Sequence, residues 1–564
     1  MAMIELAFPP AFILILGALL IGLARPGMRP VIVLLAPIVT LWAIWRLPDG
    51  VLLTAKFLSY NIELVEASSV RRLFATIFTI MAFAGGLYGL KQAKWYELAA
   101  GYAYAAGAVG VSFAGDLITL FLFWEFMAIF STVVIWCGGT EAARRAGVRY
   151  ALMHLIGGVL LKIGIEGIMV HTGSIEIQPL NLDTVDAWIV LAGVLINAAA
   201  PPVSAWLADA YPEGSPFGTV FLSAFTTKTA VLALMLLFPG AQVLIWVGLY
   251  MVFYGIIYAL LENDMRRILA YSIVNQVGFM VTGIGIGTEM ALNGAAAHAF
   301  AHIIYKALLL MSAGAVLYQT GKRKCTDLGG LYQTMPITAI CGIIGALAIS
   351  AFPFTSGFIS KSMISQAAAN EHLAWVWYLL TAASAGVFLH AGIKFPWFVF
   401  FQKDSGLRPP DPPWNMRAAM ILFAVLCIGL GCFPGLLYQL LPYAVDYEPY
   451  TGAHLVSQFQ LLLFSGLAFF LLLPLMKRTL TISLDLDWIY RVVLFRLAGL
   501  VQRVWSRLLD GLEDWWKASG RNGSRRLVGW LLPGGLLART WPTGSMTLWV
   551  TVILVLVVVL AQRS

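Results

Sequence analysis

The chain has 564 residues, of which 60% are hydrophobic and only 11% are charged. A soluble protein carries about 25% charged residues, and apolar runs of the ~20 residues that span a bilayer recur along this sequence. The composition excludes a soluble domain with a single anchor and predicts an all-α polytopic membrane protein. The net charge of +8 does not indicate nucleic-acid binding, because Lys and Arg gather in particular loops.

Apolar runs predict sixteen membrane-spanning helices, at residues 4–24, 30–46, 72–90, 95–114, 117–137, 148–171, 187–207, 216–237, 241–261, 268–287, 291–318, 335–367, 373–401, 414–440, 456–476 and 546–561. The first run follows no cationic segment, so we expect a retained helix rather than a signal peptide. Residues 485–519 alternate charged and aromatic side chains, which predicts an amphipathic helix along the cytoplasmic interface. The last run, almost purely Val and Leu, has the composition of an anchor.

Positive charge divides the connections between these helices into two classes. Most odd-to-even connections carry Lys or Arg, whereas even-to-odd connections are mostly acidic or neutral. Only the 47–71 stretch and the loop between the seventh and eighth helices depart from this pattern. Because basic loops stay in the cytoplasm, we expect both termini on the outer side of a prokaryotic cytoplasmic membrane.

The order of helix types recurs in two five-helix units. Each unit has a His/Lys helix, a broken helix and a Lys helix. The first unit is marked by His154, Lys162, Pro201, Pro202 and Lys228. The second is marked by His298, His302, Lys306, Pro353, Gly357 and Lys394. An odd number of helices per unit forces inverted orientations, which is the architecture of ion transporters.

These patterns divide the chain into six regions. They are N-terminal helices 1–94, a first inverted repeat 95–237, a second inverted repeat 238–401, C-terminal helices 402–480, the amphipathic helix and linker 481–545, and the terminal anchor 546–564.

Ionisable residues within the predicted spans are candidates for a proton path, because a charge at the bilayer centre costs roughly 2.5–3.5 kcal/mol on insertion scales. The main candidates are Glu125, Lys228, His298, His302, Lys306 and Lys361. The spacing i, i+4, i+8 places His298, His302 and Lys306 on one helix face. Imidazole titrates near neutrality, and buried carboxyl and amine groups change charge with their surroundings.

Structural roles compete with several of these interpretations. An interhelical salt bridge is the alternative for Glu125, and a zinc site or a hydrogen bond to a neighbouring helix is the alternative for the histidines. Lys394, near a helix end, fits snorkelling as well as a path. The i, i+4 pair Lys162 and Glu166 fits self-neutralisation as well as function. Residues more typical of helix caps or loop-fixing positions are Asp116, Asp209 and Asp264.

Sites for cofactors and metals are not predicted. The five cysteines form no CxxC pair, and the sequence has no P-loop, dinucleotide fingerprint, haem site or iron–sulfur ligand set. We expect no cofactor, no metal, and neither a redox nor a hydrolytic site in this chain.

Several motifs carry a family resemblance across about residues 95–400. They are Asp116 to Glu125, Trp206 to Ala210, Thr227 to Thr229, Arg266 to Gly278, His298 to His302 with Lys306, and Ser356 to Lys361. In these motifs the chain resembles the proton-translocating antiporter-like subunits of respiratory complex I, membrane-bound hydrogenases and Mrp-type sodium/proton antiporters. The Lys228 helix looks most like the D-type Mrp subunit. The resemblance implies an input role for Glu125, a central path through Lys228, His302 and Lys306, and an output role for Lys361.

One position departs from the family pattern. The resemblance implies a lysine nine residues before Trp206, paired with Glu125, but that position is Asn197. Asparagine forms hydrogen bonds but carries no proton charge. The unusual mid-helix Lys162 is our sequence-based candidate for the missing cation.

Three functions remain open from the sequence. The first is a proton-translocating subunit, with or without sodium antiport, that works with other membrane subunits of an Mrp-, hydrogenase- or complex I-like assembly. The second is a stand-alone cation transporter, and the third is a membrane scaffold for inorganic-carbon uptake. The amphipathic segment 485–519 favours a partner, and the set of Glu125, Lys228 and Lys361 argues against a pure scaffold.

Overall fold

The computed structural model describes residues 8–57, 60–474, 485, 487–518 and 549–552. These residues fall into two compact parts. The first part contains residues 8–55, 61–474 and 485, and the second contains residues 56–57, 60, 487–518 and 549–552.

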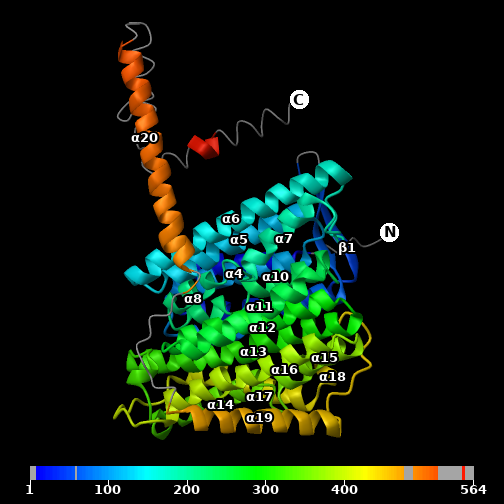
Figure 1. Ribbon diagram of the computed structural model, residues 1–564, viewed down its shortest axis with the longest axis vertical. Helices are drawn as coiled ribbons and strands as arrows, with labels where there is room; N and C mark the ends of the chain where they lie inside the picture. Colours follow the sequence, from blue (N-terminus) through cyan, green and yellow to red (C-terminus); the bar gives the residue numbers. More distant parts are fainter. Residues whose placement is uncertain (1–7, 58–59, 475–484, 486, 519–548, 553–564) are drawn as a thin grey trace. The chain divides into compact units, whose positions relative to one another are not determined.

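Helices dominate the first part (Figure 1). Those before the first helix break are α1 (Pro10–Leu23), α2 (Arg29–Arg46), α3 (Ser69–Gly89), α4 (Trp95–Phe113), α5 (Leu117–Trp136), α6 (Glu141–Thr172) and α7 (Val185–Asn197). The next are α8 (Ala205–Ala210), η1 (Tyr211–Glu213), α9 (Gly218–Leu222), α10 (Thr226–Leu237), α11 (Val243–Leu261), α12 (Met265–Ile286) and α13 (Glu289–Thr320). The remainder are η2 (Cys325–Asp327), η3 (Leu331–Gln333), α14 (Pro336–Ile349), α15 (Ser356–Asn370), α16 (Ala374–Val387), the π-helical η4 (Phe388–Lys394) and η5 (Trp397–Phe401), α17 (Trp414–Cys432), α18 (Gly435–Tyr438) and α19 (Gly452–Leu472).

The helices agree with the predicted membrane class. Among the described residues, eleven helical stretches are long and apolar enough to cross a membrane, and α1, α7 and α14 are shorter apolar helices. At least one helix overlaps each predicted span from 4–24 to 456–476. The last predicted span, 546–561, lies largely outside the described residues.

A β-hairpin occupies the stretch that the sequence left as a mixed connection. It consists of β1 (Gly50–Phe57) and β2 (Tyr60–Ala67). The main chain of Glu63 in β2 accepts a hydrogen bond from the Gly115 N–H at 2.9 Å and donates one to the Asp116 carboxylate at 2.7 Å. Contacts with the α4–α5 connection therefore hold β2 in place, and the local sequence of the hairpin does not predict these contacts.

Asp116 and Asp264 cap helices, as the sequence predicted. The Asp116 carboxylate accepts hydrogen bonds from the N–H groups of Ile118 and Thr119, both at 2.8 Å, at the start of α5. It also accepts the Thr119 hydroxyl at 2.6 Å. Asp264 accepts hydrogen bonds from two N–H groups at the start of α12. A side-chain acceptor at this position satisfies donors that no helical carbonyl reaches.

Replacing Asp116 with Ala is expected to lower the free energy of unfolding by about 2–4 kcal/mol, because a buried cap and its donors lose their partner together. SDS titration of the purified protein in mixed micelles measures the change. Asp183→Ala, in an exposed loop, is the matched control and should shift the unfolding midpoint little. Equal shifts in the two variants would contradict the capping role.

Two helices break within their predicted spans. The first break, residues 198–204, separates α7 from α8 and contains Pro201 and Pro202. The second, residues 350–355, separates α14 from α15 and contains Pro353. The prediction of Gly357 as a break is wrong, because this residue is the second of α15. A Cβ there would overlap the Ala348 carbonyl oxygen, so the glycine instead permits close approach of the two half-helices.

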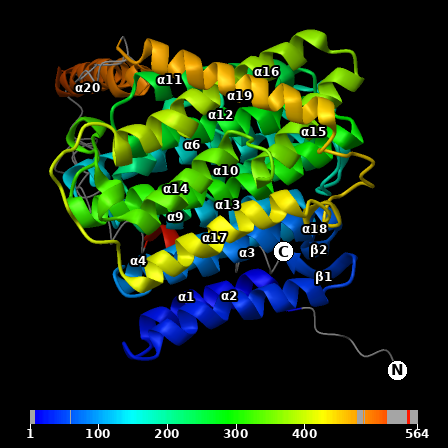
Figure 2. The same cartoon turned by 90° about the horizontal axis from the view of Figure 1, so that it is seen from below.

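The interior of the first part is built on α12 and α13, whose residues are almost all buried. Helices α1 and α2 pack against α4 and α3 on one side, and α19 lies on the other side against α16 and η4 (Figure 2). α19 is largely exposed. Polar side chains on α12 and α13 therefore lie inside the first part and away from its exposed surface.

The second part contains the predicted amphipathic segment. It forms the π-helical turn η6 (Ile489–Val493) and α20 (Leu494–Ala518). An ion pair between Arg491 and Asp487, 2.9 Å apart, precedes α20. Exposed apolar side chains recur at helical spacing at Leu497, Leu500, Val501, Val504, Trp505 and Leu508.

Candidate functional site

The predicted polar face of α13 is fully buried and joins α12 to α15. His298, His302 and Lys306 have no exposed surface. Nδ1 of His298 lies 2.9 Å from the Ser360 hydroxyl on α15, and its Nε2 lies 3.2 Å from Oε1 of Gln276 on α12. The His298 imidazole on α13 therefore links α12 and α15 through hydrogen bonds.

His302 lies between other titratable groups of α13. Its ring centroid is 6.3 Å from that of His298 and 5.3 Å from that of Tyr305. Neither of its ring nitrogens has a hydrogen-bond partner among the described residues. Buried polar atoms normally form hydrogen bonds with protein or water, so the ring nitrogens of His302 are able to form hydrogen bonds with water.

Three buried lysines belong to this polar region, on α10, α13 and α15. The Lys306 amine donates to the Ser272 hydroxyl at 2.8 Å on α12. The Lys228 amine on α10 donates to the Ser223 carbonyl at 2.7 Å and to the Thr227 hydroxyl at 3.0 Å. The Lys361 amine on α15 donates to the Ile349 carbonyl at 2.7 Å, an acceptor freed by the second helix break.

None of Lys228, Lys306 and Lys361 forms an ion pair with a described residue, although each is at most 2% exposed. Their partners are neutral carbonyls and hydroxyls. Neutral partners leave each amine's charge uncompensated, which makes its protonation sensitive to other charges nearby.

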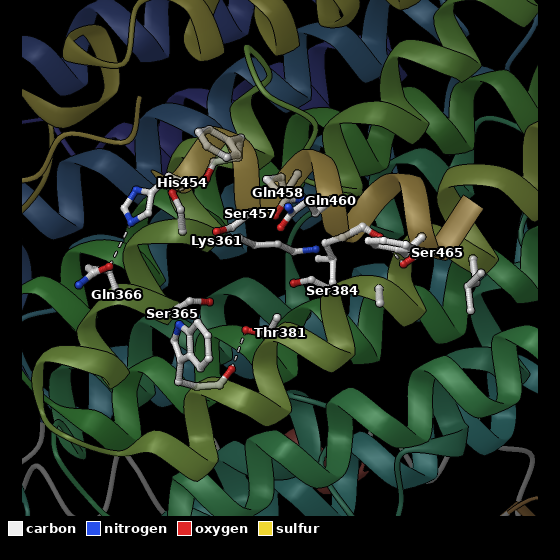
Figure 3. Close-up of a pocket in the computed structure, with 18 of the residues that line it drawn as sticks. Lys361, Ser365, Gln366, Thr381, Ser384, His454, Ser457, Gln458, Gln460 and Ser465 are labelled. Atoms are coloured by element: carbon white, nitrogen blue, oxygen red, sulfur yellow. Dashed lines mark hydrogen bonds between the residues drawn. The ribbon is translucent and has the colours of Figure 1, made fainter. Parts of the chain in front are cut away.

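A pocket of about 690 Å³ opens over Lys361 between α15, α16 and α19 (Figure 3). Its polar lining comprises Lys361, Ser362, Ser365, Gln366, Thr381, Ser384, His454, Ser457, Gln458, Gln460 and Ser465. His454 and Gln366 lie together at one side, 3.1 Å apart between Nε2 and Oε1, while the Lys361 amine points into the middle (Figure 3). Hydroxyl and amide side chains thus line the space between the Lys361 amine and the pair of His454 and Gln366, which lie near the ends of α19 and α15.

Glu125 occupies a different kind of position, on α5 against α6. Its carboxyl fills the space that a side chain on Gly158 would take. Oε1 is buried and has no hydrogen-bond partner among the described residues. The interhelical salt bridge that the sequence left open is therefore not formed within the part of the chain that the structure describes.

Lys162, the sequence-based cation candidate, and His154 on the same helix differ in their surroundings. Lys162 binds Glu166 on the same helix, and the two side chains are 38% and 48% exposed. His154 is buried, and its Nδ1 lies 2.7 Å from Oδ1 of Asn197 on α7. The sequence singled out Lys162, but the geometry brings His154 to the Asn197 position.

Lys394 has a structural environment. Its amine donates to the carbonyls of Ala259, Leu260 and Glu262, at 3.1, 2.6 and 2.6 Å, where α11 ends. These carbonyls have no helical partner, so the ammonium caps α11 and complements its negative end.

Lys394→Ala is therefore expected to lower the free energy of unfolding by about 2 kcal/mol, because hydrogen bonds to a charged donor are lost. SDS titration in mixed micelles checks this. Lys322→Ala, at an exposed position in a loop, should be neutral by comparison. An unchanged midpoint for Lys394→Ala would contradict the capping role.

Several polar partners were missed by sequence reasoning. Ser272, Gln276 and Ser360 hold Lys306 and His298 from other helices. Their only signal is polarity within apolar spans, which ordinary interhelical hydrogen bonds also produce. For the zinc alternative, no group of three or more His, Cys, Asp or Glu residues that could hold a metal occurs within the described ranges.

Comparisons with known proteins agree with this arrangement. The family described as NADH:quinone oxidoreductase/Mrp antiporter, transmembrane, matches residues 114–387. The D-type subunit of the Na(+)/H(+) antiporter of Alkalihalophilus pseudofirmus is 31% identical over 366 residues, which cover 61% of this chain and 71% of that protein. The A/B-type subunit of a probable K(+)/H(+) antiporter of Rhizobium meliloti is 29% identical over 396 residues, 64% of this chain but only 40% of that protein.

A solved structure shares the fold. A chain in the structure of the Mrp complex from Dietzia sp. DQ12-45-1b has a TM-score of 0.69 at 21% identity, with 80% of this chain and 99% of that chain covered. Motifs, buried polar helices and relatives lead to one conclusion: the chain belongs to the NADH:quinone oxidoreductase/Mrp antiporter family of transmembrane proteins.

Proposed function

We propose that this chain is a proton-translocating subunit of a larger membrane complex. The proposed path runs through Glu125, Lys228, His302, His298, Lys306 and Lys361. The observation that carries it is the set of buried amines and imidazoles on α10, α13 and α15 that form no ion pair with any described residue. Such groups are costly inside a membrane protein and are typical of ion pathways.

Coulomb repulsion between neighbouring sites drives the proposed movement. A proton that arrives at Lys228 adds a positive charge in a region of low dielectric, and this charge repels a proton held on the α13 face. The hydroxyl and amide groups of Ser272, Gln276 and Ser360 supply short hydrogen-bond steps between helices. Lys361 then releases the proton into its pocket.

The charge pattern of the loops supports a pocket that opens toward the outer side of the membrane. Gln366 near the end of α15 and His454 in the first turn of α19 belong to helix ends that this pattern assigns to the outer side. In the proposed architecture the chain contains two inverted repeats, and each repeat is interrupted by one of the two helix breaks. α15 and the pocket over Lys361 then form the outer half-channel.

Partner subunits are part of the proposal. Relatives bear names of antiporter subunits, and the fold is shared with a chain of an Mrp complex. The exposed apolar side chains of α20 fit an interfacial helix in contact with lipid or a neighbouring subunit.

Native purification followed by identification of co-purifying chains tests the assembly. Proton flux through the purified complex in liposomes, driven by a potassium diffusion potential with valinomycin, tests translocation without requiring the natural energy source. Recovery of the chain alone would favour a stand-alone transporter. Absence of a flux above protein-free liposomes would favour a scaffold.

A further inference from the structure

Glu125 and two polar side chains of the next two helices contribute three buried polar atoms that lack hydrogen-bond partners among the described residues. They are Oε1 of Glu125, Nε2 of His154 and Nδ2 of Asn197, and none has a hydrogen-bond partner among the described residues. They lie on three consecutive helices, α5, α6 and α7. One is an acceptor, one a donor, and the imidazole nitrogen can be either.

The geometry of α6 brings Glu125 near His154. The Glu125 carboxyl occupies the side-chain space of Gly158, which lies four residues after His154. Positions four apart on a helix are neighbours on one face, with Cβ atoms about 5–6 Å apart. Gly158 also lies four residues before Lys162, so the carboxyl is about one turn of the same helix from both His154 and Lys162.

The hydrogen bond with Asn197 selects the tautomer of His154. The Asn197 oxygen that lies 2.7 Å from Nδ1 only accepts, so Nδ1 carries the hydrogen. In the neutral imidazole this leaves Nε2 without a proton and therefore ready to take one. Trp206, which donates to the Ile196 carbonyl at 2.8 Å, packs on the ring at a centroid distance of 4.7 Å and holds its orientation.

Beside the imidazole, a chain of hydroxyl groups that starts at Tyr150 leads to the helix of Lys228; no hydrogen bond joins it to Nε2 among the described residues. The Tyr150 ring lies 4.0 Å from the His154 ring between centroids. The Tyr150 hydroxyl is 3.3 Å from the Thr226 hydroxyl, which is 2.5 Å from the hydroxyl of Tyr104. Thr226 begins α10, two residues before Lys228.

We infer that His154, held by Asn197, is the proton-carrying partner of Glu125 and passes protons toward Lys228. The proton leaves the Glu125 carboxyl, binds Nε2 to form the imidazolium, and leaves Nε2 for the hydroxyl chain. The imidazole is then neutral again, and the Glu125 carboxylate returns to its initial state when it takes up the next proton from the input side. While it is present, the imidazolium stabilises the Glu125 carboxylate. Lys162 has no part in this step, because its amine is neutralised by Glu166 and partly exposed. The inference rests on the proposed function.

The test compares variants of the complex in liposomes, with proton flux driven by a potassium diffusion potential. His154→Gln keeps a hydrogen bond to Asn197 but cannot carry a proton, and its flux should fall about tenfold or more. Lys162→Ala is the matched control on the same helix and should keep wild-type flux. The amount of assembled complex recovered is measured for each variant.

A rescue variant separates proton carriage from packing. In His154→Ala with Asn197→Lys, the new amine reaches the space of the imidazole, and flux should recover to within about threefold of wild type, since the amine again carries a proton. His154→Ala alone should stay low. Failure of the double variant to recover flux while it assembles normally overturns the inference, as does wild-type flux in His154→Gln. If Lys361→Ala loses flux in the same experiment while His154→Gln does not, the proposed function stands and only this inference fails.

Discussion

Lys361→Ala is expected to reduce proton flux about 100-fold or more while leaving assembly intact, because it removes the single amine that faces the pocket between α15, α16 and α19. An ammonium has three donors, and Lys361 uses one of them on the Ile349 carbonyl. The remaining donors are available to molecules that enter the pocket. The ring of Phe279, 4.8 Å from the amine, supports the charged form.

Two variants sharpen the interpretation of this result. Lys361→Arg keeps a positive charge but does not release a proton, since guanidinium stays protonated in proteins. Its flux should be as low as that of the alanine variant. Lys394→Ala removes a lysine that caps α11 and should retain flux per assembled complex. Normal flux in Lys361→Ala would refute the proposed exit, and high flux in Lys361→Arg would show that charge alone suffices.

Lys228→Met is expected to abolish flux and at the same time to stabilise the protein by about 1–4 kcal/mol. The Lys228 amine has no exposed surface and binds only the Ser223 carbonyl and the Thr227 hydroxyl. Burial of an ammonium without a carboxylate opposes folding, and a methionine of similar shape removes that penalty. A functional group that destabilises its own fold is typical of an active site.

A gain in stability would show that the loss of flux in Lys228→Met does not come from a loss of structure. SDS titration in mixed micelles gives the unfolding midpoint, and potential-driven flux gives the activity of the same preparation. Asp116→Ala provides the opposite case, since it removes a satisfied buried carboxylate and should lower stability. A fall in stability for Lys228→Met would contradict the argument that its charge is uncompensated.

Much of the candidate site was predictable because helical periodicity places residues on a face without reference to other helices. The spacing of His298, His302 and Lys306 predicted one buried face, and the structure places all three inside the first part. The caps at Asp116 and Asp264 were predictable for the same local reason. The role of each path residue remains a prediction until the flux experiments are done.

Partners on other helices were not predictable from a single chain. The cation candidate next to Asn197 shifted from Lys162 to His154 because Lys162 turns outward to Glu166, whereas His154 reaches α7. The sequence left Lys394 open between snorkelling and a path role, and three carbonyls of the α11 terminus surround its amine. In each case the decisive atoms belong to residues that side-chain patterns do not mark.

The sequence by itself determined the membrane class, the approximate positions of the helices and most of the candidate buried charges, because hydropathy and helical period are local properties of the chain. Only the tertiary structure decided which of these charges remain unpaired. It pairs Lys162 with Glu166, caps α11 with Lys394, and leaves Glu125, His154 and His302 with unsatisfied buried atoms among the described residues. The physical reason is that pairing depends on distances between helices, and these distances come from packing.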